Sequence, residues 1–161
     1  MDIIENWQKI REHFNKSFSS NFHVSIASVD IDGNPTATPI GSFFLNDDQT
    51  GFYFEKYPQS LPIHAEYNNR ICVLAVNSNK LFWLNSLFQG KFTGYPGVKL
   101  YGELGKRREA SEQETQRLER RMKATKGLKG NSYLWGDMLS VREVVFSRAE
   151  KINLGKMTTD L

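Results

Sequence analysis

The sequence predicts a mainly β (α+β) fold in which antiparallel strands form a small barrel. Residues 22–57 have the pattern of three consecutive strands with a turn between each pair. Residues 71–76, 98–104 and 141–146 add three more strand patterns, and helical patterns flank the strands. A three-strand meander of this kind forms one wall of a small barrel.

Residues that favour turns separate the three strands of the meander. Residues 23–30 alternate apolar and polar side chains and are followed by Asp-Gly-Asn-Pro at residues 32–35. Residues 36–45 are rich in β-branched and aromatic side chains, which favour strands, and they end at an Asn-Asp-Asp turn. Residues 50–54 form the third strand. The sequence therefore predicts three continuous strands joined by two turns.

An amphipathic N-terminal helix is predicted within residues 1–19. Apolar side chains recur at steps of three, four and seven, which places them in one stripe along a helix. We expect this stripe to pack against the barrel or against a partner subunit. The stripe consists of Ile3, Ile4, Trp7, Ile10, Phe14 and Phe18.

The second half of the chain alternates helices and strands. Residues 71–76 form a continuous apolar run, which is typical of a strand buried on both faces, and Cys72 is expected to be a core residue. Residues 79–88 have a helical pattern and residues 98–104 alternate as a strand.

A capping box begins the long charged helix that follows. The Ser111 oxygen can accept the amide of Glu114 while the glutamate reaches back to the Ser111 amide. The helix is predicted to run to about Lys126, and only two of its side chains, Leu118 and Met122, form an apolar pair. After the last strand, the polar tail at residues 156–161 is expected to be disordered.

Size and composition predict one domain over residues 1–161. The chain has 11 Phe, 6 Tyr and 3 Trp, which supply contact area for a core, a dimer interface or a pocket for a flat ligand. Its single cysteine excludes an internal disulfide, and the N-terminus lacks the features of a signal peptide. No segment has the length of a membrane span. We therefore expect a cytoplasmic protein without membrane partners.

The net charge of +3 is mild, but basic residues concentrate between residues 106 and 129. Nine Lys and Arg side chains there face four acids. One interpretation is a surface for nucleic acid or an anionic membrane. The favoured interpretation is a solvated helix face, because no nucleic-acid motif accompanies the charge, and a nucleic-acid partner is not expected.

The sequence has no set of side chains that would perform chemistry by itself. The three histidines, His13, His23 and His64, are far apart and have no metal-ligand spacing, so no metal site is predicted. Nucleophile-elbow, P-loop and dinucleotide motifs do not occur. Such a barrel either binds without chemistry or takes its chemistry from a cofactor.

Several segments resemble one family in their order and spacing. They are residues 26–35, Thr38-Pro39-Ile40-Gly41, residues 51–54, residues 66–73 and residues 98–104, followed by the capped helix and a final strand. Over roughly residues 20–150 this order resembles the flavin-binding split barrels related to pyridoxamine 5'-phosphate oxidase. The resemblance implies a six-stranded antiparallel split β-barrel with an N-terminal helix and peripheral helices.

The resemblance also implies a homodimer that binds flavin mononucleotide (FMN) in a groove at its interface. By position, the isoalloxazine ring would lie beside Pro39, Ile40, Gly41 and Ser42. The phosphate side would include Phe54, Glu55, Lys56, Ser60 and Leu61. Trp135 either stacks on the flavin or packs in a core or interface, and the segment Phe82-Trp83-Leu84 is expected in the dimer interface.

The sequence departs from the family pattern on the phosphate side. The loop Gln59-Ser60-Leu61-Pro62 has no cation, and Glu55 stands where a hydroxyl residue is common. A phosphate needs charge-assisted donors, which Lys56, Arg70, Lys99 or Arg142 would have to supply. Two functions therefore stay open: an FMN-binding protein, with flavin-dependent oxidoreductase activity as one form, or a non-catalytic split barrel whose groove is empty or binds haem or a deazaflavin.

Overall fold

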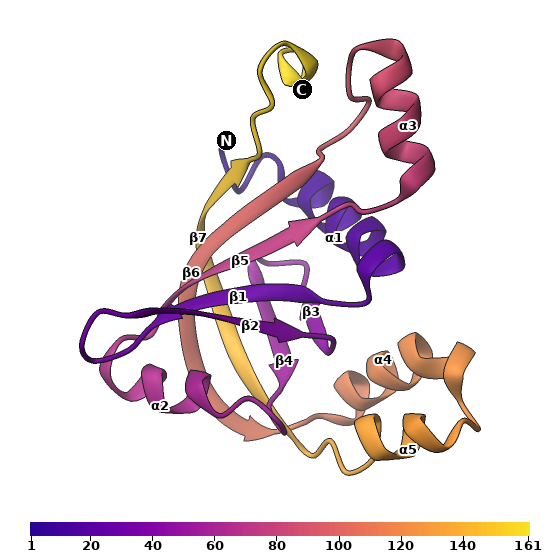
Figure 1. Ribbon diagram of the computed structural model, residues 1–161. Helices are drawn as coiled ribbons and strands as arrows, with labels where there is room; N and C mark the ends of the chain where they lie inside the picture. The colour runs from indigo at the N-terminus through magenta and orange to yellow at the C-terminus, as the bar shows by residue number, and fades with distance from the viewer.

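The computed structural model describes all residues, 1–161, as one curled, seven-stranded antiparallel sheet with helices packed around it (Figure 1). The strand order is β2-β1-β5-β6-β7-β4-β3. The strands are β1 (Val24–Val29), β2 (Pro35–Ile40), β3 (Phe43–Leu45), β4 (Thr50–Phe54), β5 (Arg70–Val76), β6 (Gly97–Glu109) and β7 (Ser140–Lys151). The helices are α1 (Trp7–Asn21), α2 (Ser60–Tyr67), α3 (Lys80–Gln89), α4 (Glu112–Met122) and α5 (Lys129–Trp135), with two short 3₁₀ turns, η1 (Lys123–Thr125) and η2 (Gly155–Thr158). None of these helices combines the length and the apolarity that crossing a bilayer requires.

The sheet has seven strands rather than the predicted six because the second predicted strand is broken. Residues 36–45 form β2 and β3, separated by Gly41 and Ser42. β2 pairs with β1, whereas β3 pairs with β4 at the opposite end of the strand order. The two outer strands are therefore consecutive in the chain, and the two edges of the curled sheet meet at Gly41-Ser42.

The predicted turn between the first two strands is confirmed. The Asp30 carboxylate accepts hydrogen bonds from the backbone amides of Asp32 and Asn34, at 3.0 and 2.8 Å. Gly33 has φ of 87°, a conformation in which a side chain would be strained. These bonds fix the register of β1 and β2, in which Val24 faces Ile40.

The apolar stripe of the N-terminal helix packs on the sheet, which is one of the two arrangements predicted for it. Trp7, Ile10, Phe14 and Phe18 are buried in the main core together with inward-facing residues of the strands. The helix begins at Trp7 rather than near Asp2, because the Asp2 carboxylate accepts the amides of the next residues and forms a separate turn.

A second, smaller core lies between β3, β4 and α4. Phe44, Phe52 and Phe54 of the strands pack with Leu118 of α4, and Met138 and Val141 complete the cluster. The capping box predicted for α4 is confirmed, with the Glu114 amide donating to Ser111 Oγ at 3.2 Å and the Ser111 amide donating to Glu114 Oε2 at 2.8 Å.

Two predictions about burial were wrong. β5 is buried on one face only, because Ile71, Val73 and Ala75 point into the core while Cys72 is half-buried on the other face. The polar tail is ordered rather than disordered, since Thr158 is buried and the carbonyl of Met157 accepts the amide of Phe92 at 2.9 Å.

Candidate functional site

The four residues predicted for the flavin ring lie where β2 passes into β3. Ile40 and Ser42 point into the protein and are buried, and Ser42 Oγ donates to the carbonyl of Phe54 at 3.2 Å. Pro39 is exposed and Gly41 is half-buried. Only Pro39 and Gly41 therefore present surface to a ligand in a single chain.

Trp135 lies directly against Gly41. A Cβ atom added at Gly41 would lie 2.8 Å from Trp135 Cη2 and 3.2 Å from the carbonyl oxygen of Phe22. Both distances are shorter than ordinary van der Waals contacts, so the close approach of the indole depends on glycine. This contact brings together two predicted site residues that are far apart in the sequence.

Lys56 and Tyr57 attach the segment after β4 to the same region. Lys56 Nζ donates to the carbonyl of Gly136 at 2.5 Å, and the Tyr57 hydroxyl donates to the carbonyl of Tyr133 at 2.5 Å. We call Gly41, Lys56, Tyr57, Tyr133 and Trp135 the junction site. Three separate parts of the chain form it: the β2–β3 break, the β4–α2 connection and α5.

The other predicted phosphate-side residues divide between core and surface. The side chains of Phe54 and Leu61 are buried in the two cores. Ser60 is half-buried at the first turn of α2, whose N-cap residue Gln59 makes no side-chain hydrogen bond to the helix. The amides of this turn are therefore not satisfied by a capping side chain.

Glu55 points toward β7 rather than toward a ligand. Its carboxylate accepts two hydrogen bonds from the Arg142 guanidinium, at 2.5 and 2.8 Å, and one from the Tyr53 hydroxyl at 2.7 Å. Burial, then the Glu55 charge and hydrogen bond, raise the pKa of Tyr53 well above its usual range. This buried ion pair removes Glu55 as a source of repulsion at a phosphate site, and it also removes Arg142 as a phosphate donor.

Of the four cations that the sequence offers to a phosphate, Lys56 is the one at the junction site. Lys99 Nζ pairs with Glu150 at 3.1 Å on the sheet. Arg70 is exposed and lines a shallow cavity with Asp30 and Tyr67.

Two arginines that the sequence analysis placed on a solvated helix face are turned inward. Arg117 donates to Asn46 Oδ1 and to the carbonyl of Leu45, both at 2.7 Å, and Arg121 donates to the carbonyl of Phe43 at 2.5 Å. The interpretation of this helix as wholly solvated was therefore wrong at these two positions. The four-residue spacing of Arg117 and Arg121 places them on one face of the helix, but nothing in the sequence shows that this face turns inward.

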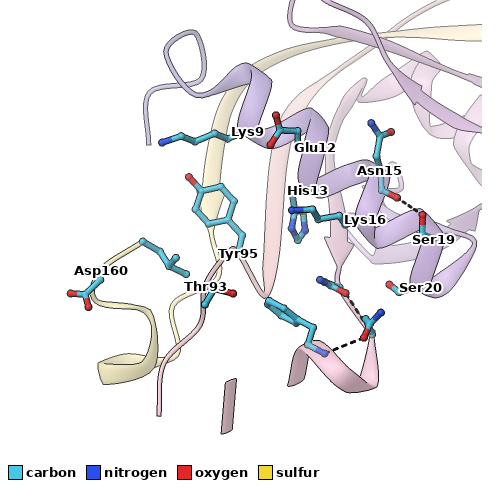
Figure 2. A pocket seen from close by; sticks show the side chains of 15 residues that line it. Lys9, Glu12, His13, Asn15, Lys16, Ser19, Ser20, Thr93, Tyr95 and Asp160 are labelled. Carbon is cyan, nitrogen blue, oxygen red and sulfur yellow. Dashed lines mark hydrogen bonds between the residues drawn. The ribbon is translucent and has the colours of Figure 1, made fainter. Parts of the chain in front are cut away.

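An open cavity lies elsewhere and contains none of the predicted site residues. It measures about 770 Å³ and is open to solvent between α1, α3 and the residues around Tyr95 and Asp160 (Figure 2). Polar side chains of α1 line it, among them Lys9, Glu12 and Lys16.

At the inner end of this cavity, His13 is buried and held by the sheet. Its Nε2 lies 3.0 Å from the carbonyl oxygen of Ala75 and 3.0 Å from Ser17 Oγ. Because a carbonyl only accepts, Nε2 carries a proton and donates it to Ala75. Burial lowers the pKa of His13, which keeps the imidazole neutral.

No group of three His, Cys, Asp or Glu side chains converges anywhere in the chain as a metal site would require. Cys72 does not have the environment of a reactive thiol, because burial raises its pKa.

Comparisons with known proteins identify the fold class of this chain by its structure and not by its sequence. No protein-family model matches the sequence, and no curated protein matches it. Solved structures do match, and they are split barrels of the kind found in pyridoxamine 5'-phosphate oxidase. The chain has this fold, as the sequence resemblance implied.

Three of the matching structures illustrate the likeness. An FMN-binding protein from Syntrophomonas wolfei matches with a TM-score of 0.61 at 13% identity, over 94% of this chain and 95% of that one. HupZ of Group A Streptococcus has a TM-score of 0.56 at 19% identity, over 92% and 94% of the two chains. A putative pyridoxamine 5'-phosphate oxidase from Lactobacillus delbrueckii has a TM-score of 0.52 at 16% identity, over 86% and 90%.

Two further structural neighbours are named for ligands other than FMN. An F420 reductase matches with a TM-score of 0.56 at 10% identity, over 85% of this chain and 95% of that one. The haem storage protein HutZ of Vibrio cholerae matches with a TM-score of 0.53 at 12% identity, over 94% and 95%. At these identities the likeness establishes the fold and leaves the ligand open.

Proposed function

We propose that this protein is a homodimeric split barrel that binds FMN at the junction site. The observation that carries the proposal is the convergence of Gly41, Lys56 and Trp135 from three separate parts of the chain. An FMN-binding protein is among its structural neighbours. The proposal assigns the flavin to residues that the sequence resemblance indicates, but to a site within one chain, whereas the resemblance implies a groove at the dimer interface.

The residues of the junction site match the parts of the cofactor chemically. Trp135 offers a flat aromatic surface for the isoalloxazine, and Gly41 lets the indole lie against the backbone between β2 and β3. Lys56 would supply positive charge for the phosphate, and the first turn of α2 at Ser60, which no side chain caps, would supply amide donors. When bound, the flavin would supply the hydride and electron transfer, while the protein would position it and shape the pocket.

The partner in the proposed dimer is a second copy of the chain. α3 carries an exposed apolar surface of Leu81, Leu84, Leu87 and Phe88, whose side chains are 63–91% exposed. Apolar surface of this kind on a helix marks a protein contact. The sequence analysis expected Phe82-Trp83-Leu84 in the interface. Of these, Leu84 belongs to the exposed surface, whereas Phe82 and Trp83 are half-buried and pack on Phe92.

Titration of the purified, flavin-free protein with FMN tests the proposal. We expect quenching of flavin fluorescence with saturation, and an affinity for FMN that falls about tenfold or more in Lys56→Gln, because a charge-assisted bond to phosphate is lost. Lys91→Gln, which removes an exposed lysine away from the junction site, is the matched control and should bind like the wild type. Fluorescence that is unchanged by the protein at every concentration would refute the proposal.

One observation favours a second candidate, a split barrel that binds haem or a deazaflavin or has an empty groove. The loop at residues 59–62 has no cation, and Arg142 is paired with Glu55. Lys56 is therefore the one cation on the phosphate side, fewer than the family pattern predicts. Parallel titrations with haem and with a deazaflavin, followed by visible absorbance, separate the two candidates. Saturable binding of one of these with no response to FMN would favour the second.

A further inference from the structure

A small enclosed cavity between α1 and α4 has a strongly basic lining. Its volume is about 80 Å³, and Arg11, Arg117 and Arg121 line it together with Phe14 and Phe18. No acidic side chain lines this cavity. A single water occupies about 30 Å³ in the liquid, so the cavity has room for a group of a few heavy atoms.

The two arginines of α4 make their protein contacts with neutral groups only. Arg117 and Arg121 bond to carbonyl and amide oxygens of β3 and the turn after it. The Arg121 guanidinium is also sandwiched between aromatic rings, 4.0 Å from the centre of Phe18 and 3.5 Å from that of Phe44. These contacts hold the guanidinium groups rigidly without neutralising their charge.

The nearest carboxylates are engaged elsewhere. Asp47 pairs with Arg11 at the rim of the cavity, where the Asp47 side chain is 87% exposed. Glu114, the other acid near Arg117, accepts two hydrogen bonds from Arg108 at 2.8 and 2.7 Å. The charges of Arg117 and Arg121 are therefore incompletely compensated inside the protein.

The pKa shifts are consistent with uncompensated charge. Burial, followed by the nearby Arg117, lowers the pKa of Arg121 to about 9. Burial and then the Arg11 charge lower the pKa of Arg117 as well. Two arginines one helical turn apart repel each other, so their inward placement costs stability unless an anion lies between them.

Unused donors remain on both guanidinium groups. A guanidinium carries five N–H groups, and Arg121 makes one hydrogen bond to the protein while Arg117 makes two. Arg117 Nε and Arg121 Nε and Nη2 make no hydrogen bond to the protein. These nitrogens are accessible, because every fully buried side-chain nitrogen or oxygen in the chain has a partner. The cavity is the accessible space that both arginines line.

We propose that Arg11, Arg117 and Arg121 form a binding site for a small oxyanion of the size of phosphate or sulfate, enclosed between α1 and α4. Forked N–H donors match the oxygens of such an anion, and Phe14, Phe18 and Phe43 form aromatic walls around the cavity. This site is separate from the junction site and does not depend on the proposed flavin.

Thermal unfolding with inorganic phosphate as the probe tests the site, with sodium chloride at matched ionic strength as the reference. At a hundredfold excess over the dissociation constant we expect the wild-type midpoint to rise by about 5–10 °C relative to chloride. The matched control is Arg120→Met, which removes one exposed arginine from the same helix and should give the full rise. Arg121→Met should lose it.

Calorimetric titration with phosphate gives a second readout if Arg121→Met folds poorly. Arg117→Gln, which keeps a polar side chain at the half-buried position, should then weaken the binding of phosphate by about tenfold or more. An equal rise of the midpoint in wild type, Arg120→Met and Arg121→Met would show a general salt effect and overturn the proposal.

Two further outcomes separate this site from the junction site. An FMN affinity that is the same in wild type and in Arg121→Met agrees with two separate sites, and if the wild type binds no FMN, the phosphate measurements still test the anion site on their own. Phosphate protection that disappears in Lys56→Gln but persists in Arg121→Met would place the anion at the junction site instead and would overturn the inference.

Discussion

A hydrogen atom in place of a side chain at Gly41 lets Trp135 lie against the backbone between β2 and β3. The indole would be 2.8 Å from an added Cβ, and the carbonyl of Phe22 would be 3.2 Å from it. At this position one residue controls both the closure of the sheet and the surface offered to a flat ligand.

Gly41→Ala should therefore destabilise the protein by about 1–3 kcal/mol, because the new methyl group overlaps the indole and the backbone must shift. Urea unfolding of the variant measures this change. Gly94→Ala is the matched control, since nothing lies within 4 Å of its added Cβ, and it should be close to neutral. If the clash with the indole dominates, Gly41→Ala should cost much less in a Trp135→Ala background.

His13 should make the stability of the fold depend on pH. Burial lowers its pKa in the folded protein from the ordinary 6.5, so the unfolded chain binds the proton more strongly. Stability is then fully present above pH 6.5 and is lost as the pH falls from 6.5 through the folded pKa, by at most about 1.4 kcal/mol per pH unit.

Urea midpoints measured between pH 7.5 and 5 test this dependence, at pH values chosen to bracket the ordinary histidine pKa of about 6.5. The slope with pH should flatten in His13→Gln and stay unchanged in His23→Gln, because His23 is exposed. A slope that survives the loss of His13 would assign the dependence to another group.

At the scale of elements, the capping box of α4 is a local sequence pattern that is present in the folded protein. Ser111 and Glu114 bond reciprocally, and Arg108 on β6 binds the same carboxylate. Ser111→Ala should cost about 1 kcal/mol of stability because the Glu114 amide loses its acceptor. Chemical denaturation measures the loss, and Ser132→Ala, at an exposed position of α5, should have little effect.

Elements with a strong local pattern could be predicted from the sequence. The hairpin at Asp30–Asn34, the apolar stripe of α1 and the capping box all depend on neighbours within a few residues, and all three are present. The general order of strands and helices followed from the same signals.

Features that depend on distant contacts could not be predicted. The break at Gly41-Ser42 arises because the two halves of one strand pair with opposite edges of the sheet. Arg117 and Arg121 turn inward because the carbonyls of β3 lie beside α4, more than 70 residues away in the sequence. α5 has weak local signals and is held by its contacts with Lys56 and Tyr57.

The predicted site shows the same division between local and distant information. The sequence resemblance selected Gly41, Lys56 and Trp135, which the structure brings together. Ile40, Ser42, Phe54 and Leu61 are buried, and this burial depends on packing against elements that are distant in the sequence. Whether these residues touch a flavin stays a prediction.

At the scale of the whole molecule, the curled sheet places its two edges at one point and leaves α3 exposed far from it (Figure 1). If a second copy covers α3, the double variant Leu84→Glu/Phe88→Glu should convert the dimer to a monomer, because like charges would be buried in the contact. Light scattering coupled to gel filtration measures the mass. Gln89→Glu, an exposed polar position on the same helix, should leave the dimer intact, and a dimer that persists in the double variant would place the interface elsewhere.

Native mass spectrometry of the purified protein after incubation with FMN tests the central proposal most directly, because it reads subunit number and cofactor in one measurement. The account predicts a complex of two chains with one FMN per chain, and a lower FMN occupancy in Lys56→Gln. Single chains that carry no flavin at saturating FMN would contradict it.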